Sequence, residues 1–181
     1  MKIVMILAFF AQLIFFELQS YNDEHLIQLN TTGVCTFCDL VGLKSNNLNL
    51  NPGVQITDLS GSDLRWSRLS DLDLRNIKLN NVNLEFARLS RVNLKKADLS
   101  NARLLDVELH RVNLRETCLD FANFSHAIFY KVDLRNLRSS IGTIWPNDLD
   151  QSNPARCLNI PMGEIAPVFS DSEAESVDLE E

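Results

Sequence analysis

The sequence predicts an all-β solenoid, and two regular spacings predict it. Sixteen consecutive positions spaced by five, from Leu59 to Leu134, carry a leucine or, twice, a phenylalanine. On an α-helix such residues would point to every face, and on one flat strand they would alternate between opposite faces. The residue two positions earlier is Ala, Val, Ser or Thr in fourteen of the sixteen cases, and residues two apart on extended backbone share a face. Short extended sides separated by bends satisfy both spacings, because each pair then points into the interior of a coil.

Two of the repeats read "ADLSN" from Ala97 and "ANFSH" from Ala122. They resemble the pentapeptide-repeat family, whose consensus is Ala, then Asp or Asn, then Leu and two variable positions. The resemblance covers residues 35–136 and implies a right-handed quadrilateral β-helix with about twenty residues in each coil. Residues 57–136 would then form four complete coils, stacked at the strand spacing of ~4.8 Å.

The first twenty residues form a segment separate from the repeats. One Lys precedes a largely apolar run over residues 3–16, which is short for a membrane span and typical of the core of a signal peptide. We therefore expect residues 1–20 to be a signal peptide of an exported protein, in the periplasm or, by resemblance to exported family members, the thylakoid lumen. Leu18 and Ser20 match the small-residue cleavage rule only loosely. An uncleaved anchor, the only expected membrane contact, and a buried first helix are the alternatives.

Residues 21–34 are expected to form a short helix that caps the N-terminal end of the coils. Asn22 and Asp23 are residue types that cap helix N-termini, and Gly33 is a stop signal. An open β-helix end exposes unpaired strand edges and its core, so a helix lying across it blocks edge-to-edge association. A partner-binding helix is the alternative.

Two of the four cysteines, Cys35 and Cys38, are close together at the start of the repeats. Counting back by fives from Leu50 makes Leu40 a core position, which puts Cys38 in the small inward slot and Cys35 in the preceding core slot. Three chemistries are open: two buried free thiols, half a zinc site with His25 as the nearby nitrogen ligand, or a disulfide. Export and the resemblance favour the disulfide, because exported family members carry similar paired cysteines next to "CDL".

The frame of the repeats slips between Leu50 and Leu59. Five residues after Leu50 is Gln55, whereas the later series, counted back from Leu59, falls one residue earlier. One residue is therefore missing from the regular frame. Pro52 and Gly53 predict a local turn that absorbs the shift.

No catalytic motif accompanies the repeats. Sequences of the HExxH, phosphate-loop and GxSxG types are absent, and the three histidines, His25, His110 and His126, are scattered along the chain. Most carboxylates occupy the outward position before a leucine, where a hydrogen bond to local backbone is the simplest role. We therefore expect no enzymatic activity, no cofactor and no metal site.

Two classes of function compete. By resemblance to exported pentapeptide-repeat proteins, the chain is a structural or interaction module that binds another protein through its side walls. By resemblance to cytoplasmic members, it is a topoisomerase-binding protein whose acidic rod mimics DNA. Residues 55–135 carry thirteen basic and eleven acidic side chains, and residues 136–181 carry two basic and nine acidic. Because the rod is not acidic, we expect the first class, with an unknown protein partner and no nucleic acid.

If four repeats make one coil, every fourth repeat lies on the same wall, and the charged residues are then distributed unequally among the four walls. Two adjoining walls, centred on Leu69 and Leu74 with their counterparts in later coils, carry ten basic and five acidic side chains. These cations form either a solvated ladder or an anion-binding surface for an acidic partner or for the chain's own acidic tail. The candidate binding residues are Arg68, Arg88, Arg91, Arg111 and Lys131 on the first wall and Arg75, Lys95, Arg115 and Arg135 on the second.

Residues 137–181 follow the repeats. The fifth residue after Leu134 is Ser139, so we expect the chain to leave the coils there. We expect Ile141, Ile144 and Trp145 to cover the last coil without a second helix, because an exposed leucine layer would associate with other molecules. The sequence ends in "SDSEAESVDLEE", whose acidity and low hydrophobicity predict disorder.

Overall fold

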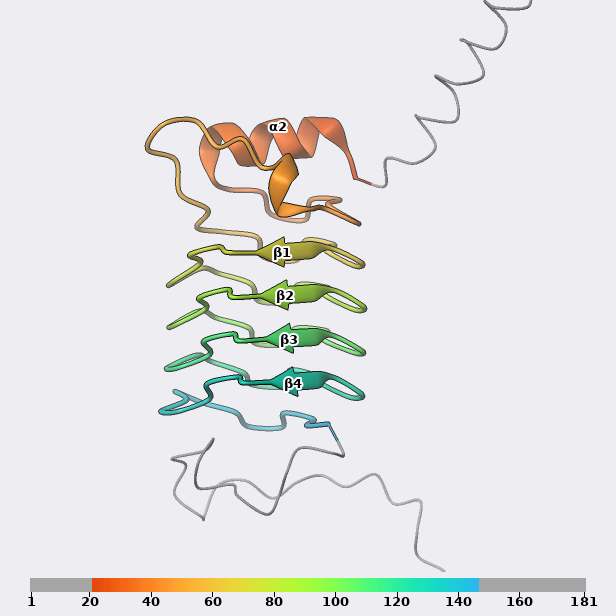
Figure 1. Ribbon diagram of the computed structural model, residues 1–181, viewed down its shortest axis with the longest axis vertical. Helices are drawn as coiled ribbons and strands as arrows, with labels where there is room; N and C mark the ends of the chain where they lie inside the picture. Colours follow the sequence, from red (N-terminus) through yellow and green to blue (C-terminus); the bar gives the residue numbers. More distant parts are fainter. Residues whose placement is uncertain (1–20, 147–181) are drawn as a thin grey trace, which may run out of the picture.

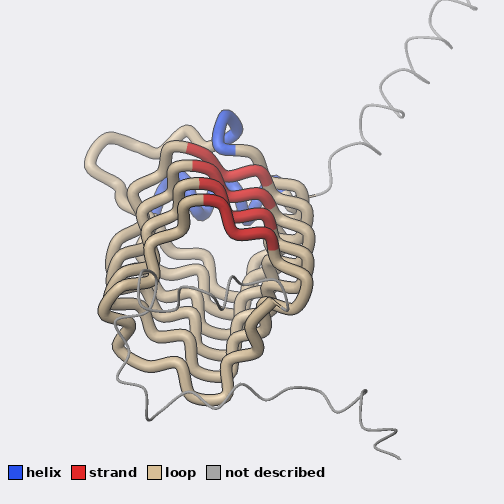
Figure 2. The backbone as a smooth tube through the Cα atoms, turned by 60° about the horizontal axis from the view of Figure 1, so that its bottom comes forward, coloured by secondary structure: helices blue, strands red, loops and turns tan. Residues whose placement is uncertain are grey.

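A computed structural model describes residues 21–146 as a right-handed quadrilateral β-helix (Figure 1). Figure 2 shows the stacked coils as a four-sided tube with its strands along one wall. These strands form a parallel sheet in the order β1-β2-β3-β4. The predicted fold class is confirmed. The strand bounds are β1 Arg68–Ser70, β2 Arg88–Ser90, β3 Glu108–His110 and β4 Ile128–Tyr130.

Successive coils in the middle of the tube are twenty residues apart. Arg68 of β1 pairs with Arg88 of β2, which pairs with Glu108 of β3. Isolated bridges on the other walls have the same spacing, as between Asn93 and Asn113. Because side chains in register on parallel strands point the same way, residues twenty apart form straight columns on the outside of the tube.

The leucines of the five-residue spacing fill the interior of the tube. Leu84, Leu94 and Leu104 are each no more than 2% exposed, and Phe124 is fully buried in the same slot. Burying one such side chain contributes about 1.5–3 kcal/mol. Small residues two positions earlier, such as Val82, are also buried and pack between the larger ones. Repeated layers of the same apolar contacts therefore hold the coils together.

The coils turn at residues in the left-handed conformation, two positions after a core residue. Sixteen non-glycine residues have positive φ, fifteen of them at five-residue intervals from Trp66 to Asn136. At many corners the core carbonyl accepts a hydrogen bond from the residue three positions later, as Leu94 does from Ala97 at 3.0 Å. With positive φ at the third residue, Lys96, this corner has the geometry of a type II turn. None of the sixteen is β-branched, which fits the steric cost of branching in this conformation.

Helix α2, Asp23–Thr32, lies across the N-terminal end of the coils (Figure 1). The side-chain oxygen of Asn22 accepts a hydrogen bond from the backbone N–H of Glu24 at 2.8 Å, and Gly33 ends the helix at a φ of 71°. Leu29 is fully buried in the core cluster. The predicted capping helix is confirmed, and Leu29 is the side chain that closes this end.

The first coil is longer than the twenty residues expected, and the predicted slip of one residue from the five-residue frame is confirmed. Asp39 pairs with Asp63, and Lys44 pairs with Arg68, at a spacing of twenty-four residues. The predicted inward positions of Cys35 and Cys38 are nevertheless correct, and Leu40 between these ladder positions is buried as well. A spacing of twenty-four is one residue short of five repeats, so the slip is correct, whereas the expected length of twenty residues for this coil is wrong.

The additional residues of the first coil form a loop that packs on α2. After the 3-10 helix η1, Ser45–Asn47, the chain leaves the ladder until it rejoins it at Asp58. The side-chain oxygen of Asn30, in α2, accepts a hydrogen bond from the backbone N–H of Asn49 at 2.9 Å. The predicted turn at residues 52–53 is present in this loop. Counting by fives fails here because the helix, and not a neighbouring coil, holds this backbone.

The ladder continues beyond residue 136, so the predicted departure of the chain at Ser139 is wrong. The backbone N–H of Arg138 donates to the carbonyl of Thr117, while the carbonyl of Ser139 accepts from the N–H of Leu119. Arg138 and Ser139 therefore both lie opposite Cys118, which is the arrangement of a β-bulge. The bulge adds one residue, and the spacing to the preceding coil becomes twenty-one.

Because the bulge shifts the repeat frame by one residue, it changes which residues cover the last coil. It places Trp145 in the slot of a core leucine, where its ring stacks on Phe124 with centroids 5.6 Å apart. Ile141 and Ile144 are instead 64% and 44% exposed. The prediction that Trp145 covers this end is therefore correct, whereas the same prediction for the two isoleucines is wrong, because the shifted frame turns them outward.

No helix within residues 21–146 is long and apolar enough to cross a membrane. The expected signal peptide or anchor, residues 1–20, and the expected acidic tail lie outside the described residues.

Candidate interaction surface

Two adjoining walls of the tube hold the nine predicted binding residues, and in-register coils bring each set onto its own wall. The strand wall has the β1–β4 sheet at its middle and consists of residues 66–71, 86–91, 106–111 and 126–131. It carries Arg68, Arg88, Arg91, Arg111 and Lys131. The asparagine wall consists of residues 73–76, 93–96, 113–116 and 133–136, and it carries Arg75, Lys95, Arg115 and Arg135.

Two arginines of the asparagine wall pair with carboxylates two residues earlier. Arg75 lies 2.7 Å from Asp73, and Arg135 lies 2.7 Å from Asp133. The hydrogen bond from Arg75 lowers the pKa of Asp73, and that from Arg135 lowers the pKa of Asp133. Residues on either side of a core leucine both point outward, so a repeat with an acid before the leucine and an arginine after it neutralises itself.

The lysines of the asparagine wall share one carboxylate. Lys95 and Lys96 lie 2.9 Å and 3.6 Å from the carboxylate oxygens of Glu116, and the hydrogen bond from Lys95 lowers the pKa of this group. The Nε of Arg115 is buried, with no hydrogen-bond partner among the described residues. The column of four cations therefore exposes much less uncompensated charge than its sequence indicates.

A ladder of side-chain amides runs beside this column and gives the wall its name. Asn113 donates from its amide nitrogen to the side-chain oxygen of Asn93 at 3.1 Å, and Asn93 donates in the same way to Asp73 at 3.3 Å. The Asn113 oxygen also accepts from the backbone N–H of Arg115 at 3.0 Å. The outward position before each leucine thus bonds to local backbone, as expected, and links successive coils.

The strand wall holds two ion pairs between neighbouring coils. Arg91 lies 2.5 Å from Asp71, and Arg88 lies 3.0 Å from Glu108. The hydrogen bond from Arg91 lowers the pKa of Asp71. All four side chains are substantially exposed, so solvent screens these pairs.

Other cations of the strand wall have no carboxylate partner among the described residues. Arg68 and Arg111 make no ion pair there, and Lys131 lies instead above the ring of Tyr130, 5.3 Å from its centroid. Lys44 of the first coil is exposed and in register with Arg68, so it extends the arginine column by one coil. The strand wall therefore presents cations that are available to an anionic group.

Two exposed aromatic rings stack at the corner beside the arginine column. The centroids of Trp66 and Phe86 are 4.3 Å apart, with planes at 10°, and the residues are 59% and 36% exposed. A shallow groove of about 410 Å³ lies between these rings and the column of Arg68 and Arg88. Its remaining lining comes from Asp106, Glu108, His126 and Ile128.

Trp66, Phe86 and Lys44 are functional candidates that the repeat pattern does not reveal. The two aromatic residues occupy variable outward positions and become a pair only when the twenty-residue coil is known. A search for large apolar residues twenty apart at outward positions finds them. Lys44 has no comparable signal, because the longer first coil hides its register with Arg68.

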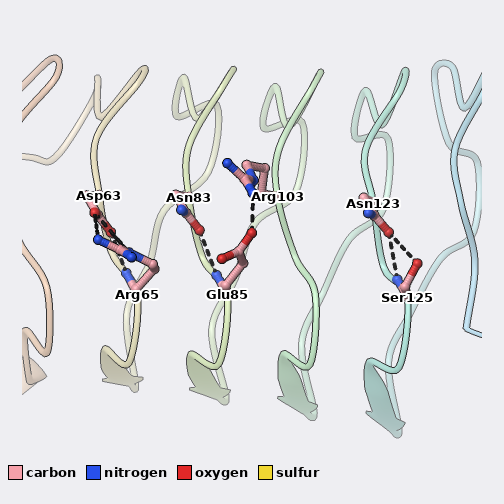
Figure 3. Close-up of polar contacts among 7 residues, drawn as sticks. All are labelled: Asp63, Arg65, Asn83, Glu85, Arg103, Asn123 and Ser125. Atoms are coloured by element: carbon pink, nitrogen blue, oxygen red, sulfur yellow. Dashed lines mark hydrogen bonds and ion pairs between the residues drawn. The ribbon is translucent and has the colours of Figure 1, made fainter.

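The wall on the other side of the aromatic corner is internally paired, like the asparagine wall (Figure 3). Arg65 lies 2.6 Å from Asp63, and Arg103 of the following coil lies 2.9 Å from Glu85. Figure 3 shows these side chains directed at each other along the wall. Free cations and exposed stacked rings therefore occur together on the strand wall.

The predicted cysteine pair lies close together in the first coil. The Sγ atoms of Cys35 and Cys38 are within bonding distance, with Cα atoms 5.5 Å apart. The ring of His25 is engaged elsewhere, because its Nδ1 accepts a hydrogen bond from the backbone N–H of Asp39 at 2.9 Å. Within residues 21–146 no three His, Cys, Asp or Glu side chains gather as a metal site would need.

A family model described as "Pentapeptide repeats" matches residues 57–95, 67–104, 93–130 and 108–138, with eight copies. No curated protein matches the chain. Among solved structures, a trypsin-treated QnrB1, described as a plasmid-mediated fluoroquinolone resistance protein, is 16% identical with a TM-score of 0.43. That match covers 49% of this chain and only 57% of QnrB1. A pentapeptide repeat protein, Rfr23, from the cyanobacterium Cyanothece 51142 is 23% identical, with a TM-score of 0.35 over 68% of this chain and 98% of that one.

Proposed function

Because residues 57–138 are pentapeptide repeats, the chain is a pentapeptide-repeat protein, and we propose that it is a non-enzymatic protein-interaction module whose binding face is the strand wall. The exposed stack of Trp66 and Phe86 beside Arg68 and Arg88 carries this proposal. Tryptophan and arginine are the residue types that most often dominate protein–protein binding energy. Here they lie on either side of one groove.

The backbone under this groove supports a binding role because it is fixed before any partner arrives. Each outward residue of β1–β3 is in register with its neighbour in the next coil. The coils themselves rest on a buried leucine core. Binding to such a surface costs little ordering entropy in the module, which favours affinity.

The charge of the wall favours an acidic partner protein. Lys44, Arg68, Arg111 and Lys131 lack carboxylate partners among the described residues, so an acidic segment gains contacts without breaking existing ion pairs. The alternative, an acidic rod that mimics DNA and binds a topoisomerase, is disfavoured by the thirteen basic and eleven acidic side chains of residues 55–135. An acidic partner also explains why charge and exposed rings coincide on this wall.

We further propose export to an oxidising compartment such as the periplasm or thylakoid lumen, with a disulfide between Cys35 and Cys38. The support is the sequence of residues 1–20 together with the close approach of the two sulfurs. Intact-mass analysis of protein from the native host should find a chain that begins near Tyr21, two hydrogens lighter than its reduced form at this pair. A chain that retains Met1 and has both thiols free contradicts this proposal.

Affinity capture with matched variants tests the binding face. The wild-type chain and a control with Arg75→Gln and Arg135→Gln should retain the same partner from extracts of the native compartment. A variant with Trp66→Ser and Arg68→Gln should lose about tenfold or more of it, because both changes fall in the groove. If all three chains retain the same proteins equally, or none retains any, the strand wall is not a binding face.

A further inference from the structure

The cation–aromatic cluster is the set Lys44, Trp66, Arg68, Phe86 and Arg88, and it is asymmetric across the groove. One side is apolar, formed by the two stacked rings. The other side begins with Arg68 and Arg88, and Lys44 extends this column beyond the groove lining. Of these three cations only Arg88 has a carboxylate partner among the described residues. A ligand that fits both sides must combine an acidic edge with an apolar edge.

The chain's own end has this chemistry. Residues 157–181 contain seven acidic side chains and no Lys or Arg. Within "DSEAESVDLEE", residues 171–181, Val177 alternates with Asp178, and Leu179 with Glu180. Since successive residues of a strand point to opposite faces, an extended chain over residues 177–180 places these two apolar residues on one edge and the two acids on the other.

The chain is long enough to bring this segment to the cluster. The described residues end at Pro146, four coils from Trp66, a distance of roughly 20 Å at ~4.8 Å per coil. Residues 147–170 can span up to roughly 80 Å when extended. Attachment within one chain gives the tail an effective concentration on the order of millimolar, so weak charge pairing is enough to fill the groove.

We propose that residues 171–181 dock in the groove of the cation–aromatic cluster and compete there with the acidic partner. Val177 and Leu179 face the rings of Trp66 and Phe86, while the carboxylates of Asp178 and Glu180 face Lys44 and Arg68. This inference rests on the binding face of the proposed function, and it makes the free protein self-occluded. A partner then binds by displacing the tail, which lowers its apparent affinity in proportion to the occupied fraction.

Zero-length carbodiimide cross-linking of the full chain tests the contact, because the reagent joins lysine amines only to carboxylates that touch them. The expected product is an intramolecular cross-link between Lys44 and a carboxylate of residues 171–181. Its yield should fall several-fold from about 50 to 500 mM salt, as exposed charge pairs are screened. An Arg68→Gln variant should lower the yield about two- to fivefold, whereas Arg75→Gln on the asparagine wall should leave it unchanged.

The other exposed lysines serve as internal controls for this experiment. Lys78 is 67% exposed at its side chain and lies near Asp58, and Lys131 lies over Tyr130 at the far end of the strand wall. Tail cross-links spread over all lysines, concentrated at Lys131, or found only between molecules overturn the proposal. The same holds if the yield does not depend on salt.

Tryptophan fluorescence gives an independent readout. With Trp145→Phe, Trp66 is the only tryptophan left, and its emission should shift to longer wavelength when residues 171–181 are deleted or their carboxylates are changed to Asn and Gln. No shift in either variant overturns tail docking.

Partner capture separates tail docking from the proposed interaction function. Equal capture with and without the tail contradicts docking but leaves the binding face standing. A Lys44 cross-link without any captured partner supports docking and contradicts the interaction function.

Discussion

The strand wall and the asparagine wall stand on the same coils and share one core, yet they use their cations differently. On the asparagine wall, Arg75 and Arg135 lie two residues after an acid, and both members of each pair point outward and meet. On the strand wall, the residue two before Arg68 is Trp66. The cation there remains free, and the neighbouring position carries a ring. The number of cations on a wall therefore does not set its available charge. Carboxylate partners set it, and these come from the same repeat for Arg75 and Arg135 and from a neighbouring coil for Arg88 and Arg91.

The largest effect should come from removing a core side chain that both walls share. Leu94→Ala deletes buried methyl groups from a residue that is 2% exposed, and such cavities cost about 2–5 kcal/mol. Urea unfolding should show this loss, and amides of both walls should exchange faster. Lys95→Gln, next to it but outward, should change stability by less than about 0.5 kcal/mol. A loss of similar size in both variants would mean that the leucine stack is not the common support of the walls.

A smaller effect should separate corner residues from wall residues. Lys96 has a φ of 64°, a conformation that disfavours branching at Cβ, so Lys96→Gly should be more stable than Lys96→Ile by about 1 kcal/mol. At Lys95, which is not among the positive-φ residues, the order should reverse, because glycine loses more conformational freedom on folding than isoleucine does. Thermal unfolding of the four variants measures both differences. The same order at both positions contradicts the assigned corner.

The smallest effect should be the loss of folding stability at acidic pH. The pKa values of Asp73 and Asp133 are lowered by their arginines from the ordinary value of 3.8, so the folded chain binds fewer protons than the unfolded chain between the folded and ordinary pKa values. This stabilisation is present above about pH 4 and is lost as the pH falls through the folded pKa values. Urea midpoints should decline over this window. The double variant Asp73→Asn, Asp133→Asn should decline less, and an equal decline in both proteins would show that these pairs do not contribute.

The spacing of five predicts the fold because it records which residues must be inside. Each core slot accepts one large and one small residue, so Leu94 and Ala97 reveal the geometry of their corner from sequence alone. The capping helix is equally visible, since Asn22 and Gly33 carry its end signals. These features depend on residues that are close together in the sequence, so a short stretch of sequence is enough to predict them.

The two ends could not be predicted because the frame changes there. The loop on α2 lengthens the first coil through contacts with Asn30, and the bulge at residues 138–139 moves Trp145 into the core. The frame slip between Leu50 and Leu59 marks an interruption of the first coil but does not give its length, and the bulge has no periodic signal. For the candidate site, the sequence places all nine cations on the correct walls but not their pairing, and it leaves Lys44 and Trp66 unmarked. Pairing depends on side-chain contacts between coils, which the repeat does not encode.

The central claim is that the strand wall, and not the equally basic asparagine wall, binds acidic ligands. An NMR titration tests it most directly, with a synthetic peptide of residues 168–181 added to isotope-labelled protein in which the carboxylates of residues 171–181 are changed to Asn and Gln. We predict shift changes at the amides of Lys44, Trp66, Arg68, Phe86 and Arg88 that weaken with salt. We predict none at Arg75, Lys95, Arg115 and Arg135. Equal shifts on both walls, or larger shifts on the asparagine wall, would contradict the claim.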